Sequence, residues 1–241
     1  MSENKLLNDA YHLEPITVSP HQLLVDPNNP RIALELDASK WTEEEIYNSD
    51  VQEEILDLLK KSNYINDLKN KIIARGWNPD ASSPFIVKRI DNNKFRVLEG
   101  NCRTTAVKLL FDDENHRDLV QNIEIKEFIY NTENQNFSEE EAIRGVLAQI
   151  HLDAPNPWGP MERAKFVYDC YVQTLKHKSL SGYDESCFMW DEEFSEDAQK
   201  INSITSQEVR KMCLIFRVYA SLKSKHPNDV NPDLYTLIEL A

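Results

Sequence analysis

The chain has 241 residues, of which 41% are hydrophobic, and it contains only 5 Gly and 11 Pro. This composition supplies apolar side chains for one large or two small globular domains, and it excludes collagen-like and low-complexity proteins. The formal net charge of −14, from 41 acidic and 27 basic residues, excludes a protein that binds nucleic acid over its whole surface, but not one with a local basic patch.

The sequence shows no pattern typical of a membrane-spanning segment, a signal peptide or a paired-cysteine motif. No apolar run approaches the ~20 residues that a membrane-spanning helix needs, and residues 1–11 lack the apolar centre of a signal peptide. The cysteines are far apart, with no C-x-x-C pair: Cys102, Cys170, Cys187 and Cys213. We therefore expect a cytoplasmic protein with reduced thiols and no membrane contact.

The first quarter of the chain changes from loop to helix. Four prolines prevent a long helix within residues 1–30, which we expect to be extended and loop-like. Thr42 and the three glutamates after it favour a helix start, so a helix or helix pair is predicted from there to about Lys61. A second helical pattern follows and is predicted to stop at Gly76.

After Gly76 the spacing of the hydrophobic residues changes from one typical of helices to one typical of strands. Residues 84–90 and 95–98 are predicted as a hairpin around the turn D-N-N-K. A helix carrying Ala106 follows, and residues 123–130 alternate as another strand. Beyond Ser138 the patterns are helical throughout. The predicted fold class is α+β, with a small mixed sheet in the first half and helices in the second.

The turn after the second hairpin strand is the most informative segment. Glu99-Gly100-Asn101 leads directly into the helix, which carries Arg103 in its first turn. Glycine lets the backbone turn sharply and lets a ligand approach, while N–H groups at a helix start and an arginine both bind phosphate. The segment is thus either an anion site or an ordinary strand–turn–helix in which the glycine only allows the backbone to turn.

The sequence G-N-C-R-T-T-A at residues 100–106 resembles the G-E-R-R-x-x-A box of the ParB N-terminal domain, in the ParB/sulfiredoxin superfamily, and is most similar to boxes that read E-G-N-R-R-x-x-A. D-P-N-N-P-R at 26–31 is similar to the family's P-x-N-P-R loop. G-W-N followed by P-F-I-V at 84–87 resembles the segment before the box. His151, Trp158 and the helix after them resemble the third motif.

This resemblance implies a nucleotide site, because the box cradles CTP in ParB and ATP in sulfiredoxin and free-serine kinases. It implies CTP or ATP, with Mg²⁺, as the cofactor. It also implies a nucleotide-binding domain at 1–135, with a helical insertion at about 42–61, and a helical domain at 136–241. The implied nucleotide-binding residues are Gly100, Asn101, Cys102, Arg103, Thr104, Thr105, Arg31, Gln149 and His151.

Three departures from the family patterns shape the expected chemistry. Asn101 stands where sulfiredoxin has its redox cysteine, so sulfiredoxin chemistry is not expected, although Cys102 beside Arg103 at a helix start is predicted to be reactive. The box has one arginine in place of two. The third motif is incomplete at Gln149-Ile150-His151. Nucleotide binding is therefore predicted with more support than hydrolysis.

The second half contains a local basic patch. Residues 199–225 hold six basic residues against Glu208 alone, and 197–221 is predicted as a helix-turn-helix whose second helix is capped by Thr205 or Ser206. Its DNA-facing residues would be Gln207, Arg210 and Lys211. The alternative is a helical pair that only packs.

Three functions follow as hypotheses. The first is a ParB-like, nucleotide-binding protein that acts with DNA in a bacterial or mobile-element system. The second is an ATP-dependent phosphotransferase, a CTPase or ATPase, or a nuclease on the same fold, with Asp26 or Glu99 as the metal-binding or general-base carboxylate. The third is a regulatory adaptor with a degenerate nucleotide site, whose acidic surface, including residues 184–197, binds a basic protein.

Overall fold

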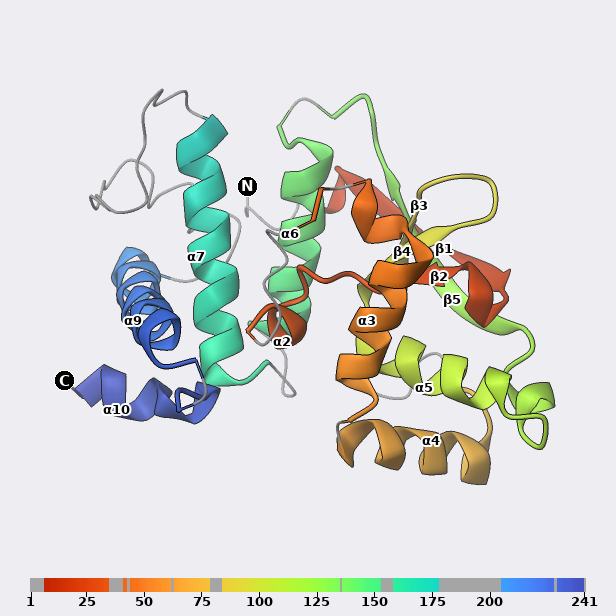
Figure 1. Cartoon of the computed structure of the whole chain (residues 1–241). Helices are drawn as coiled ribbons and strands as arrows, with labels where there is room; N and C mark the ends of the chain where they lie inside the picture. Colours follow the sequence, from red (N-terminus) through yellow and green to blue (C-terminus); the bar gives the residue numbers. More distant parts are fainter. Residues whose placement is uncertain are drawn as a thin grey trace. The chain divides into compact units, whose positions relative to one another are not determined.

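The computed structural model describes residues 7–34, 41–42, 44–61, 63–78, 84–134, 136–152, 158–177, 205–227 and 229–240 (Figure 1). The chain divides into two compact units, residues 2–139 and residues 140–241. None of the helices in the described ranges combines the length and the apolar content that crossing a membrane requires.

The first unit is built on a mixed five-stranded sheet with the order β1-β5-β3-β4-β2. β5 pairs antiparallel with β1 and parallel with β3, while β4 pairs antiparallel with β3 and parallel with β2. The prediction of an α+β fold with a small mixed sheet is confirmed. The strands are β1 (Tyr11–Val18), β2 (Leu23–Leu24), β3 (Ile86–Arg89), β4 (Phe95–Glu99) and β5 (Ile123–Tyr130).

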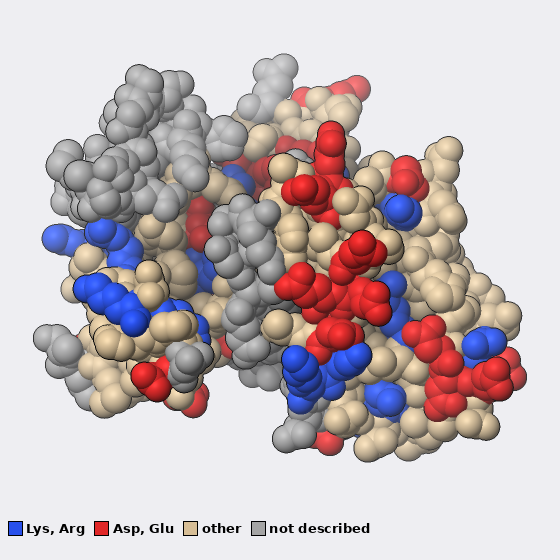
Figure 2. Space-filling view, in the orientation of Figure 1, with Lys and Arg blue, Asp and Glu red and all other residues tan. Residues whose placement is uncertain are grey.

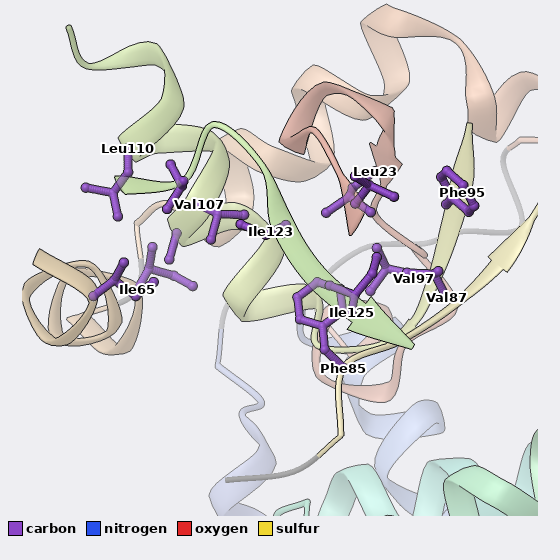
Figure 3. Packing of buried hydrophobic residues seen from close by; sticks show 14 residues of the cluster. Leu23, Ile65, Phe85, Val87, Phe95, Val97, Val107, Leu110, Ile123 and Ile125 are labelled. Atoms are coloured by element: carbon purple, nitrogen blue, oxygen red, sulfur yellow. The ribbon is translucent and has the colours of Figure 1, made fainter. Parts of the chain in front are cut away.

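Helices of the first unit pack on this sheet. Ile65 of α4 lies in one buried cluster with Val107 and Leu110 of α5 and with Ile123 and Ile125 of β5 (Figure 3). α4 and α5 run side by side (Figure 1). The helical elements are η1 (Pro20–Gln22), α2 (Pro30–Ala33), η3 (Glu45–Tyr47), α3 (Ser49–Leu59), α4 (Asn63–Arg75), α5 (Asn101–Asp112) and η4 (Arg117–Leu119).

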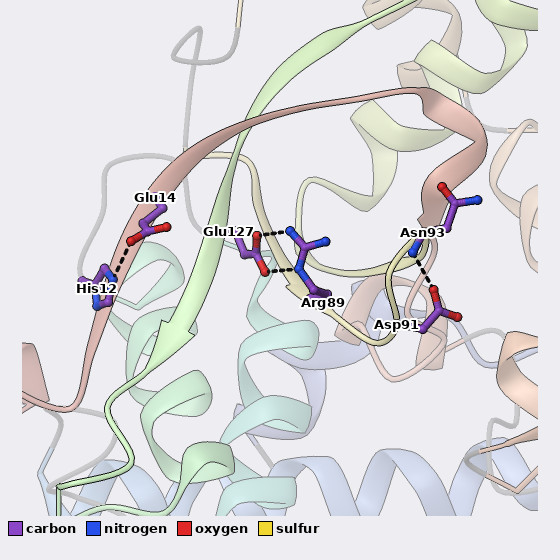
Figure 4. A network of polar contacts seen from close by, with 6 residues as sticks. All are labelled: His12, Glu14, Arg89, Asp91, Asn93 and Glu127. Carbon is purple, nitrogen blue, oxygen red and sulfur yellow. Dashed lines mark hydrogen bonds and ion pairs between the residues drawn. The ribbon is translucent and has the colours of Figure 1, made fainter.

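The predicted hairpin is confirmed as β3 and β4. The side chain of Asp91 accepts a hydrogen bond from the backbone N–H of Asn93 at 2.7 Å and so forms the turn (Figure 4). Arg89 at the end of β3 holds the buried carboxylate of Glu127 on β5 through two hydrogen bonds, of 2.8 and 2.6 Å (Figure 4). This pair fastens the neighbouring strands.

Two helix boundaries also follow the prediction. The backbone N–H of Thr42 donates to the Glu45 carboxylate at 2.7 Å and lowers the pKa of Glu45. In return, the backbone N–H of Glu45 donates to the Thr42 hydroxyl at 3.3 Å. The segment that follows is a helix pair, η3 and α3. Gly76, after α4, has a φ of +79°, as expected of a glycine that ends a helix.

The loop predicted for residues 1–30 is partly wrong, because it contains the eight-residue strand β1. β1 is an edge strand of the sheet and includes Pro15. An edge strand tolerates a residue without a backbone N–H, so the proline that argued for a loop fits here.

The described part of the second unit is helical. α7 packs against α9 through a buried cluster of Val167, Tyr171, Val209 and Cys213. Thr205 caps α9, because its side chain accepts from the backbone N–H of Glu208. The elements are α6 (Glu139–His151, beginning at the boundary with the first unit), α7 (Pro160–His177), α9 (Ser206–Lys225), η6 (Pro232–Leu234) and α10 (Tyr235–Leu240).

Candidate functional site

Gly100 joins β4 to α5 in a conformation that favours glycine. Its φ is +108°, a region that L-residues rarely adopt. A Cβ atom at this position would lie 2.8 Å from Cδ2 of Phe85, a buried ring of the core. Backbone geometry and close packing therefore both require a glycine here, whether or not a ligand binds.

Asn101 is the first residue of α5 and links this helix to the loop after β2. Its side chain is buried, and its Oδ1 atom accepts a hydrogen bond from the backbone N–H of Asp26 at 2.9 Å. Its Nδ2 atom is also buried and has no hydrogen-bond partner in the described structure. Leaving a buried donor unsatisfied costs about 1–3 kcal/mol, so this nitrogen marks a place where an acceptor is expected.

The carboxylate of Asp26 is occupied by contacts within the protein. One oxygen lies 3.0 and 2.8 Å from two nitrogens of the Arg96 guanidinium. The other accepts from the backbone N–H of Asn28 at 2.9 Å. The ion pair fixes the 26–29 loop against β4. A catalytic role for Asp26 stays a prediction, and in this conformation the group acts as a positioning acid.

Arg103 and Glu99 form the second buried pair of the site. Their closest charged atoms are 3.8 Å apart, which is longer than a hydrogen bond. The guanidinium of Arg103 donates to the backbone carbonyl of Pro84 at 3.0 Å and lies over the ring of Phe85, with Cζ 5.0 Å from its centroid. Arg103 is thus held inside the unit, beside the helix start.

Thr104 and Thr105 are completely buried. Their hydroxyl groups donate to the carbonyl oxygens of Gly100 and Asn101, both at 3.1 Å. Both hydroxyl protons are thereby used within the helix. For this reason the phosphate site proposed below does not use these hydroxyl groups as donors, and the assignment of Thr104 and Thr105 as nucleotide-binding residues stays a prediction. In this structure the two threonines fasten the first turn of α5.

The remaining residues of the predicted nucleotide site are distributed along the chain. Cys102 is half-buried and packs against the hydrophobic core of the first unit; its predicted reactivity stays a prediction. Arg31 lies in α2, and its side chain is outside the described part of the structure. Gln149 and His151 belong to α6 in the second unit, where the His151 ring stacks on Trp158 with centroids 3.8 Å apart.

The predicted DNA-facing residues are all exposed on α9. Gln207 and Arg210 lie in its first turns, and Lys211 forms an ion pair with Glu239 of α10. That contact raises the pKa of Lys211. Figure 2 shows Lys and Arg atoms gathered over α9. The first helix of the predicted helix-turn-helix and the acidic segment 184–197 lie outside the described residues.

Acidic side chains cluster on another helix that the sequence reasoning did not single out. The outer face of α3 exposes four carboxylates, which appear as a red patch over that helix in Figure 2: Asp50, Glu53, Glu54 and Asp57. Their helical spacing was readable from the sequence. Across the described ranges, no group of three or more His, Cys, Asp or Glu side chains is arranged to hold a metal ion.

Comparison with known proteins gives distant structural similarities. No family model and no curated protein matches the chain. The C2221 form of a Pnob8-like ParB-N domain aligns over 93% of this chain and 78% of its own, with 12% identity and a TM-score of 0.48. A pNOB8-like ParB N-domain aligns over 93% of this chain and 74% of its own, with 12% identity and a TM-score of 0.47.

A third solved structure is the C-terminally truncated chromosome-partitioning protein ParB from Caulobacter crescentus, complexed with CTP-gamma-S. It aligns over 93% of this chain and 98% of its own, with 12% identity and a TM-score of 0.30. These similarities are too distant to assign a role to any residue. The proposals below therefore depend on the contacts of this chain and on the motifs of its sequence.

Proposed function

We propose that the first turn of α5 binds the phosphate groups of a nucleotide and that the protein is a ParB-like nucleotide-binding protein. The observation that carries this proposal is the buried Nδ2 atom of Asn101, which has no acceptor in the described structure. It lies at the first residue of a twelve-residue helix, where the helix dipole favours an anion. The resemblance of residues 100–106 favours CTP or ATP as the ligand.

Arg103 supplies the positive charge in this proposal. A phosphate at the helix start would compete with Glu99 for the guanidinium. The 3.8 Å separation of that pair makes it the weaker of the two ion pairs, since Asp26 and Arg96 are 2.8 Å apart. We therefore expect Arg103 to move from Glu99 towards the phosphate, while the pair of Asp26 and Arg96 stays in place.

The two acidic groups do not fit a resident metal ion. Without nucleotide each of the two carboxylates faces an arginine. Asp26 stays paired with Arg96 in this proposal and is a poor Mg²⁺ ligand, whereas Glu99 is released only when Arg103 turns to the phosphate. In this proposal any Mg²⁺ arrives with the nucleotide. For the same reason we propose binding, and a role as a switch, in preference to hydrolysis or phosphoryl transfer.

Titration of the purified chain with CTP, ATP and GTP, each with Mg²⁺, tests the proposal by calorimetry. Arg103→Ala is expected to weaken binding by about tenfold or more, because a hydrogen bond to a charged group contributes about 1.5–3 kcal/mol. Arg117→Ala is the matched control, because this exposed arginine lies in the same unit and its guanidinium donates to the backbone carbonyl of Phe111. Equal affinities of the two variants, or no binding by the wild type, would contradict the proposal.

DNA contact through α9 is a second proposed function. It is supported by the charge of this helix, which carries five basic residues and one acidic residue, with Gln207 and Arg210 exposed near its start. Binding to a duplex is expected to weaken steeply with salt, and Arg210→Ala is expected to lower the salt slope by about 1. An unchanged affinity of Arg210→Ala beside the Arg117→Ala control would exclude this contact.

A further inference from the structure

A row of aliphatic side chains lies on the solvent face of α9. Leu214 and Val218 are each 46% exposed, and Leu222 is 36% exposed. Their spacing of four residues places them along one line of the helix, about 12 Å long. We call these three residues the apolar row. Exposed aliphatic side chains in a contiguous row are typical of a binding surface.

Among the described residues of its unit, the apolar row belongs to no buried cluster. The opposite face of α9 carries Val209 and Cys213, which are buried against α7. α9 therefore has two apolar faces, one buried and one exposed. Packing against α7 explains only the buried face, so the exposed face calls for a separate explanation.

Basic side chains stand at both ends of the apolar row. Arg210 and Lys211 are exposed before it and Lys225 is exposed after it. In Figure 2 the blue atoms over α9 are separated by tan ones. The distance along the helix axis from Lys211 to Lys225 is about 21 Å, or four turns. The surface is thus apolar in its middle and positively charged at its ends.

The apolar middle and basic ends of this surface fit some binding partners better than others; we compare a second copy of the chain, DNA and a helix of another protein. A second copy paired through the same face would bring Lys211 opposite Lys225 in the antiparallel orientation, and like charges opposite each other are unfavourable. DNA contact at the start of α9, as proposed above for Gln207 and Arg210, would use basic residues but would gain nothing from burial of the apolar row, and so it leaves the row unexplained. A helix with apolar residues in its middle and carboxylates at its ends satisfies both parts of the surface.

We propose that the exposed face of α9 binds an acidic amphipathic helix of a partner protein. The partner helix would carry aliphatic residues over about two turns, with Asp or Glu about four turns apart. Lys211 is paired with Glu239 of α10 within this chain, so a partner carboxylate at this end would take the place of Glu239. The proposal does not depend on nucleotide binding at α5.

The test uses a synthetic helical peptide as the probe, with leucines at i, i+4 and i+8 and glutamates at both ends, measured by fluorescence anisotropy. The wild-type chain is expected to bind it and to lose affinity with added salt. Val218→Ser is expected to weaken binding by about tenfold, since it removes the centre of the row. Ile73→Ser, an exposed apolar residue of α4, is the matched control and should bind as the wild type does.

Three results would overturn the proposal. The first is equal binding of a peptide whose glutamates are replaced by lysines, because the ends of the surface would then not select acids. The second is unchanged peptide affinity of Val218→Ser, or no peptide binding by the wild type. The third is a dimer or a duplex complex that Val218→Ser dissociates, measured by sedimentation, which would assign the row to a second copy or to DNA.

Discussion

Replacing Gly100 with alanine is expected to destabilise the first unit by about 2–5 kcal/mol. Holding φ at +108° costs an L-residue about 1–2 kcal/mol. The added Cβ would lie 2.8 Å from the ring of Phe85, and forcing a packed ring to move costs about 1–3 kcal/mol more. Gly76→Ala is the matched control, because its φ is +79° with no atom within 4 Å of the added Cβ. It should therefore cost only the backbone strain.

Urea unfolding followed by tryptophan fluorescence measures both variants. Trp77 reports on the region directly, since its ring lies edge-on to Phe85 with centroids 5.7 Å apart. We expect Gly100→Ala to lose more unfolding free energy than Gly76→Ala, and Phe85→Leu to reduce that difference by making room for the methyl group. Equal losses in the two glycine variants would refute the argument that Phe85 packing requires Gly100.

Three further predictions concern stability. Asp26→Asn should lower the free energy of unfolding by about 2–4 kcal/mol, because Arg96 loses the charge that compensates it; a neutral effect in urea unfolding would contradict the role of the pair. Thr205→Ala should cost about 1 kcal/mol through loss of the α9 cap, measured by thermal unfolding. Hydrogen bonds from the backbone N–H and the hydroxyl group of Thr205 lower the pKa of Glu208 below 4.5, so the stabilisation by this carboxylate is present above pH 4.5 and is lost as the pH falls through the folded pKa. Thr205→Ala keeps the backbone N–H and should therefore weaken this pH dependence without removing it.

Local sequence signals predicted the local structure. The D-N-N-K turn between two apolar runs gave the β3–β4 hairpin, and Thr42, Thr205 and Gly76 marked helix ends. Each of these features depends on neighbouring residues alone. β1 was missed because Pro15 argues against a strand locally, while the pairing that stabilises β1 comes from β5, more than a hundred residues away.

The site was predicted by position, whereas its contacts were not. Sequence placed Gly100 and Arg103 at a helix start, as the structure has them. It did not reveal that Asp26 pairs with Arg96, or that Asn101 holds the loop at Asp26, because these partners are 70 and 75 residues apart in the chain. Long-range pairing of polar groups leaves no periodic signal in a single sequence.

The central claim is that the Nδ2 atom of Asn101 donates to a phosphate at the start of α5. The most direct measurement is the NMR signal of the Asn101 side-chain amide, assigned by its loss in Asn101→Ser, during titration with CTP or ATP. We expect this signal and the signals of the backbone amides at the start of α5 to shift together as nucleotide binds. Saturating nucleotide that leaves the Asn101 amide unshifted, or shifts confined to other parts of the chain, would contradict it.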